Sequence, residues 1–280
     1  VLLMLQNKGF RYLEAFVGSL IFIIFCCFAY ELMISKPEIN AVLKGLLPEK
    51  EIITNGDMLY IAIGILGATV MPHNLYLHSS IVQTRDFERT NEGKKQAIKF
   101  ATIDSTVSLF LAFFINAAIL ILAASAFHFN GHQEVADIHD AYKLLEPVLG
   151  IKVASTFFAI ALLASGQNST LTGTLAGQIV MEGFLNIRLK PWLRRLITRL
   201  IAVVPALIVS ILYGEKGASN LLIFSQVILS LQLSFAVVPL LQITGNKTKM
   251  KQFVNSIFIN TVSWIIAIII GSIHQEIQKV

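Results

Sequence analysis

The segment 64–78 reads GILGATVMPHNLYLH and lies within a long apolar run. Pro72 has no N–H, so the helical hydrogen bond to the carbonyl of Ala68 cannot form, and the ring biases Met71 away from helical angles. Gly67 loosens the turn before it. We therefore expect a spanning helix broken at Gly67 and Pro72, whose freed carbonyls need a partner inside the membrane.

The composition around this segment is that of a membrane protein. The 280 residues are 55% hydrophobic and 14% charged, whereas soluble domains carry roughly 25% charged residues. Apolar runs long enough to cross a bilayer recur along the whole length. The net charge of +5 comes from basic residues that lie between those runs. This distribution is typical of the connections between membrane spans, and we expect no nucleic-acid partner.

Seven membrane-spanning helices are expected in one transmembrane domain covering residues 1–280. Each expected span is long enough to cross about 30 Å of hydrocarbon at 1.5 Å per residue. Their approximate limits are 11–34, 57–83, 100–128, 151–184, 195–213, 217–243 and 253–273.

The basic residues give the orientation of these spans. Fifteen of the 22 Lys and Arg residues fall in connections on one side, and the alternation holds through all seven spans. By the positive-inside rule that side is the cytoplasm. We expect a multi-pass protein of the plasma membrane.

The residues at the break suggest a cation site. Ala68 offers a carbonyl oxygen and Met71 a thioether sulfur three residues later. Soft sulfur favours late transition metals over Mg²⁺ and Ca²⁺, and discontinuous helices are where secondary transporters build ion sites. A kinked helix with Met71 as core filler explains the same residues, and the pattern alone does not separate the two interpretations.

Two histidines follow the break. His73 and His78 are ionisable groups inside a span, which usually mark ion paths or proton relays. Neutral structural histidines are the alternative. No Glu or Asp stands beside either one, so the general base of a membrane-embedded metallohydrolase is missing and we expect no enzyme.

Two amides deep in other spans are further candidates. Asn116 in the third span is placed to hydrogen-bond across helices, and the amide oxygen of Gln226 in the sixth could complete a coordination shell. Interhelical hydrogen bonding explains Gln226 equally well.

The sequence resembles the NRAMP family of divalent metal transporters over essentially its whole length. The run 67–79 is similar to that family's sixth-helix signature, 165–184 to its eighth helix and 225–232 to its tenth. The short loops look bacterial.

The resemblance implies an all-α, LeuT-like inverted-repeat fold in which this chain covers about helices five to eleven. By the same resemblance Ala68 and Met71 are metal ligands, and Gln226 joins them in an occluded state. His73 and His78 would belong to the proton or gating network, and Asn116 would line the outer pathway.

One departure from the family pattern concerns the other half of the site. The family's first helix carries an Asp-Pro-Gly-Asn break that supplies further ligands, and this motif occurs nowhere in the sequence. The chain opens on residues 1–5 like the tail of a spanning helix, so we expect a fragment whose N-terminal helices lie outside it.

The predicted function is proton-coupled import of Mn²⁺ or Fe²⁺, and also Cd²⁺ or Co²⁺, by alternating access. The expected partners are the metal ion as substrate, protons and the lipid bilayer, with no prosthetic group. A LeuT-fold carrier of an organic substrate is one alternative, although a thioether offers nothing to a carboxylate or an amine. A non-transporting fragment or subunit is another.

Overall fold

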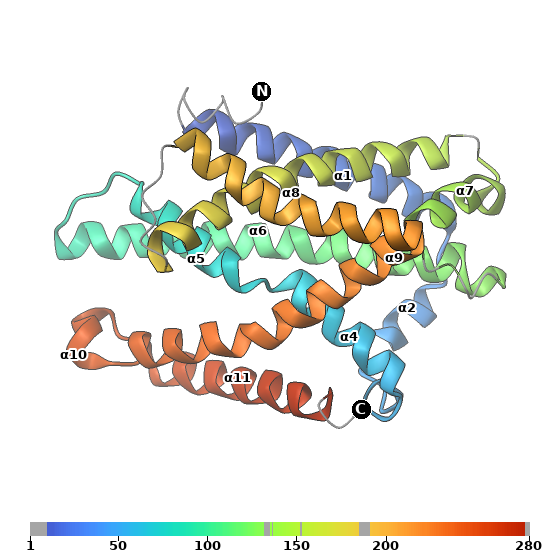
Figure 1. Ribbon diagram of the computed structural model, residues 1–280. Coiled ribbons are helices and arrows are strands. Elements are labelled where there is room, and N and C mark those ends of the chain that lie inside the picture. The colour runs from blue at the N-terminus through green and yellow to red at the C-terminus, as the bar shows by residue number, and fades with distance from the viewer. Residues whose placement is uncertain (1–9, 132–134, 136, 152, 185–190, 278–280) are drawn as a thin grey trace. The chain divides into compact units, whose positions relative to one another are not determined.

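The computed structural model describes residues 10–131, 135, 137–151, 153–184 and 191–277, and within these ranges every regular element is a helix (Figure 1). The longer elements are α1 (Phe10–Ser35), α4 (Gly56–Thr69), α5 (Pro72–Gln83), α6 (Asn91–Ala126), α7 (Ile138–Leu149), α8 (Ala154–Phe184), α9 (Pro191–Thr244) and α11 (Ile257–Ile277). The short ones are α2 (Ile39–Gly45), α3 (Glu51–Thr54), η2 (His128–Asn130), α10 (Lys247–Met250) and η3 (Lys251–Phe253).

Within the described residues four helical stretches are long and apolar enough to cross a membrane, judged by length and composition. They are Tyr12–Ser35, Gly56–Gln83, Asn91–Asn130 and Gly217–Thr244. Shorter apolar helices cover Arg199–Gly214 and Ile257–Ile273. The arrangement as one transmembrane domain of seven spans stays a prediction.

The helix α9 is bent where two spans were expected to meet. Gly214 has φ 67° and ψ −160°, which are not helical angles, so the ribbon labelled α9 consists of two helices. A positive φ of this kind costs other residues 1–2 kcal/mol or so, and glycine adopts it readily. The bend lies between the expected spans 195–213 and 217–243.

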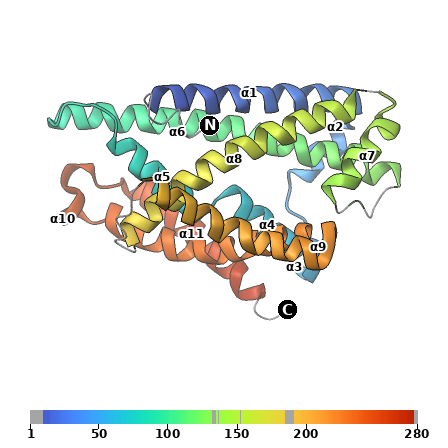
Figure 2. The same ribbon diagram turned by 45° about the horizontal axis from the view of Figure 1, so that its top comes forward.

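Unit 1 is the first of two compact parts of the chain, and it contains α1, α2, α6, α7 and α8 as far as Gln178. α1 and α6 lie side by side in both views (Figures 1 and 2). A cluster of buried side chains from α1, α6, α7 and α8 forms its core. Small residues of α8, Ala154, Ala161 and Ala164, are almost completely buried in this cluster, which permits close helix packing.

Three charged side chains of unit 1 form a small network of ion pairs at the surface. The Arg85 guanidinium lies 2.8 Å from a carboxylate oxygen of Glu14 and 3.8 Å from one of Asp104. All three side chains are more than 40% exposed, so these pairs contribute at most about 1 kcal/mol each. Asp104, at the basic end of its span, is thus a solvated group in a surface network.

Unit 2 contains α3, α4, α5 as far as Ser80, α9 from Arg199, α10 and α11. Its α4 begins where the side chain of Asn55 accepts hydrogen bonds from the N–H groups of Asp57 and Met58, at 3.0 and 3.3 Å. This cap satisfies two of the four free donors at the helix start. Leu59 and Ile63 of α4 then pack with Val227 of α9 in a small buried cluster.

The outward faces of the long helices are strongly apolar. On α6, Phe100, Leu109, Phe110 and Phe113 are each more than half exposed. A soluble protein rarely leaves so many large apolar side chains together in water. Such a surface suits lipid tails or further transmembrane helices, in agreement with a membrane protein.

Candidate metal centre at a helix break

The spanning segment Gly56–Gln83 is interrupted in its second half. α4 ends at Thr69, and its last turn is closed by the Val70 N–H, which donates to the Leu66 carbonyl at 2.9 Å. Val70 has φ −117° and ψ 82°, so the chain leaves the helix there, and α5 begins at Pro72. The first turn of α5 is closed by the Asn74 N–H on the Met71 carbonyl at 3.0 Å.

The break leaves the Ala68 carbonyl without its usual helical donor. That donor would be the N–H of residue 72, which proline lacks. Ala68 is exposed within the described chain, and Met71 next to it is half-buried. The predicted oxygen and sulfur therefore flank the same interruption.

At Gly67 the backbone of α4 lies very close to that of α9. A Cβ at this position would collide with the carbonyl oxygen of Gln226 and would lie 3.0 Å from the Ser230 nitrogen. Backbone atoms cannot move aside as a flexible side chain can, so only glycine fits. The contact sets the predicted residue Gln226 beside the turn that precedes Ala68.

The side chain of Gln226 has one satisfied end and one unsatisfied end. Its Nε2 donates to the Ser225 hydroxyl at 3.3 Å, while its Oε1 is buried and finds no hydrogen-bond donor in the described part of the chain. A buried acceptor without a partner costs about 1–3 kcal/mol. A bound cation would satisfy it.

The other predicted site residues fall at different places. His73 is half-buried and His78 exposed on α5, in the same unit as the break, and His78 makes an interaction of its own. Asn116 is exposed on α6 of unit 1. The proton or gating role of the histidines and the pathway role of Asn116 stay predictions.

The donor set at the break is unusual for a protein metal site. The described residues contain no group of three or more His, Cys, Asp or Glu that could hold a metal ion. The ligands predicted from the sequence are instead a carbonyl oxygen, a thioether and an amide oxygen. Such a neutral, partly soft set suits a transition-metal ion that is bound and then released.

Two features of the structure were missed by sequence reasoning. Gly67 was interpreted as a residue that loosens a helix, whereas it permits close contact with α9. The available signal was a second glycine three residues earlier, Gly64, which also faces α9. Glu31 was passed over although an ionisable residue inside an expected span is itself a signal. It is completely buried.

An interrupted spanning helix packed on a second helix, in a chain whose described elements are all helices, agrees with a LeuT-like membrane transporter, the fold expected above. The family model described as natural resistance-associated macrophage protein-like matches residues 1–275. The chain belongs to this family, NRAMP, as its motifs predicted.

Relatives of similar sequence are bacterial proteins. The chain is 63% identical over 274 residues to a divalent metal cation transporter MntH of Listeria monocytogenes, covering 98% of this chain and 61% of that protein. It is 62% identical to the MntH of a Nostoc species, covering 98% and 62%. The chain thus spans about three-fifths of the length of these relatives.

A solved structure agrees with this placement. The manganese transporter of Eremococcus coleocola superposes with a TM-score of 0.83 at 38% identity, covering 98% of this chain and 60% of that one. At this identity the likeness supports the LeuT-like fold and the family together.

Proposed function

We propose that this chain is part of a secondary transporter that imports divalent transition-metal ions across the plasma membrane. Mn²⁺ and Fe²⁺ are the expected substrates, and Cd²⁺ and Co²⁺ are accepted as well. The observation that carries the proposal is the break itself: Ala68, whose carbonyl has lost its donor, and Met71 flank it, and the backbone of Gln226, whose side-chain oxygen is unsatisfied, lies against Gly67. Relatives named as divalent metal cation and manganese transporters support it.

The ligand set explains the choice of metal. Thioether sulfur binds soft and borderline ions and contributes little to Ca²⁺ or Mg²⁺, which prefer oxygen throughout. An organic substrate with a carboxylate or amine would gain nothing from Met71. The site proposed here is also incomplete, since the Asp-Pro-Gly-Asn motif that supplies further ligands in the family pattern does not occur in this sequence.

In the proposed cycle, metal transport is coupled to proton transport and proceeds by alternating access. In this proposal the substrate ion binds at the break, and His73 and His78 on α5 exchange protons during the cycle, because imidazole changes charge near physiological pH. Asn116 lines the outer pathway. The inverted-repeat fold supports a rocking motion about a central site.

The test is the metal selectivity of the full-length protein in proteoliposomes, compared with its Met71→Ala variant. We expect the variant to lose its preference for Cd²⁺ and Mn²⁺ over Ca²⁺ by about tenfold or more, since loss of one good ligand contact is worth about 1.4 kcal/mol. Met58→Ala is the matched control, because Met58 is a partly exposed methionine near the start of α4. Unchanged selectivity of Met71→Ala would remove this residue from the site.

The same assay separates the remaining alternatives. A carrier of an organic substrate would show no metal uptake in the wild type and would accumulate a labelled amino acid. A non-transporting subunit would take up neither substrate in the full-length form.

A further inference from the structure

Glu31 is a buried carboxylic acid that the proposed metal cycle does not use. It lies on α1 within the candidate span Tyr12–Ser35 and is 0% exposed. Neither of its carboxyl oxygens has a hydrogen-bond partner in the described part of the chain. Ionisable groups at such depth are costly and mark ion or proton paths.

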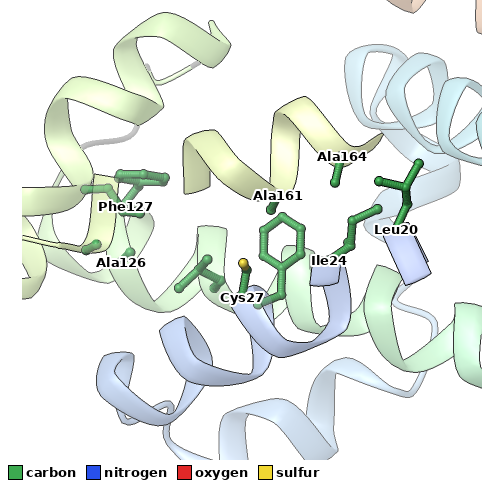
Figure 3. Packing of buried hydrophobic residues seen from close by; sticks show 11 residues of the cluster. Leu20, Ile24, Cys27, Ala126, Phe127, Ala161 and Ala164 are labelled. Atoms are coloured by element: carbon green, nitrogen blue, oxygen red, sulfur yellow. The ribbon is translucent and has the colours of Figure 1, made fainter. Parts of the chain in front are cut away.

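The spacing on α1 directs Glu31 into the core of unit 1. The buried residues Leu20, Ile24 and Cys27 precede it at spacings of three and four, which place side chains on the same face of a helix. Glu31 lies on this same buried face. Figure 3 shows Ile24 and Cys27 projecting toward Ala161 of α8, with Ala126 at the end of α6 and Phe127 just after it nearby.

The elements packed against this stripe present apolar groups. Leu122 and Ala126 come from α6, Leu145 from α7, and Ala154 and Ala161 from α8. Among the described members of the cluster, the one titratable side chain is the free thiol of Cys27, one turn before Glu31 on α1. The charged side chains that flank Leu145, such as Lys143 and Glu146 on α7, are exposed.

These surroundings determine the form of the carboxyl group. An ionised carboxylate without a paired cation is far more expensive in apolar surroundings than the neutral acid. The burial arises from this chain's own atoms. The closed packing therefore favours the neutral, protonated acid.

We propose that Glu31 is a proton-binding site in the helix cluster of unit 1, separate from the metal site in unit 2. Its O–H bond breaks when α1 separates from α6, α7 and α8 and water enters; the proton passes to water and the carboxylate is hydrated. That movement is a step of the transport cycle, so this part of the inference rests on the proposed function. The protonated state in the closed packing does not.

The first experiment measures protonation directly by infrared difference spectroscopy on purified full-length protein at neutral pH. The wild type minus Glu31→Gln spectrum should show the C=O stretch of a neutral carboxylic acid, shifted in D₂O. Glu14→Gln is the control: Glu14 is exposed and bound to Arg85 at 2.8 Å, so its removal should leave that band unchanged. A difference spectrum without the band would overturn the proposal.

The second experiment measures the pH dependence of Mn²⁺ uptake in proteoliposomes. Glu31→Gln, which copies the neutral acid, should fold and bind Mn²⁺ as the wild type does but lose the part of the pH dependence of uptake that the two histidines do not supply. Glu31→Leu serves the same purpose if the glutamine variant does not fold. Unchanged pH dependence in a folded variant overturns proton release at Glu31. A wild type that takes up no metal contradicts the proposed function instead, and the infrared result still decides the protonation.

Discussion

Gly67 decides how closely α4 and α9 approach each other. Because Gly67 has no side chain, the backbone of Gln226 can lie against it. The absence of a Cβ thus allows the residue proposed as a ligand on α9 to pack beside α4. The proposed ligands can be suggested from the chemistry of their side chains and backbone. Gly67, which lets the two helices pack together, has no functional group that would suggest its role.

The first prediction concerns that contact. Gly67→Ala should destabilise the full-length protein by about 1–3 kcal/mol, as overpacking against backbone does, and weaken Mn²⁺ binding. Thermal unfolding in detergent and metal titration measure both. Gly64→Ala is the control, because a Cβ there meets side-chain carbons at 3.7 Å, an ordinary contact. Equal effects of the two changes would show that the close approach is not what matters.

The unsatisfied oxygen of Gln226 gives the second prediction. Gln226→Leu removes a buried acceptor without a donor, so stability should not fall, while the Kd for Mn²⁺ should rise about tenfold or more if one ligand contact is lost. Isothermal titration of the full-length protein measures the affinity. Gln232→Leu, at an exposed position of the same helix, should change nothing; loss of stability without loss of affinity in Gln226→Leu would assign this amide to helix packing.

At the scale of the element, the interruption between α4 and α5 is the feature on which the site depends. A continuous helix would give the Ala68 carbonyl an N–H donor and leave no oxygen for a cation. The break falls immediately before Pro72, as expected from its missing N–H, which is a local property of the sequence. The helix is not broken at Gly67, the other residue from which a break was expected, because Gly67 lies inside α4.

Pro72→Ala tests whether the break makes the site. Restoring an N–H at position 72 gives the Ala68 carbonyl a donor and allows α4 to continue into α5 without a break. The variant should therefore be at least as stable in thermal unfolding, yet bind Mn²⁺ at least about tenfold more weakly. Pro239→Ala, in α9 and exposed, is the matched control. Wild-type affinity in Pro72→Ala would separate the metal site from the break.

At the scale of the whole molecule, the sequence predicted the fold class and the family well. Long apolar runs, alternating basic connections and the MPHNLYLH motif are strong local signals, and the family match and the all-helical fold agree with them. The ligand roles of Ala68, Met71 and Gln226 remain predictions. Contacts between distant residues, such as Gly67 with Gln226, or the complete burial of Glu31, depend on packing that a local pattern does not express.

The most direct test of the account is a crystal structure of the full-length transporter soaked with Mn²⁺, with the ion located by its anomalous scattering. We predict a peak at the break within coordination distance of the Met71 sulfur and the Ala68 carbonyl oxygen. A peak elsewhere, with the Met71 side chain facing lipid, would contradict the central claim.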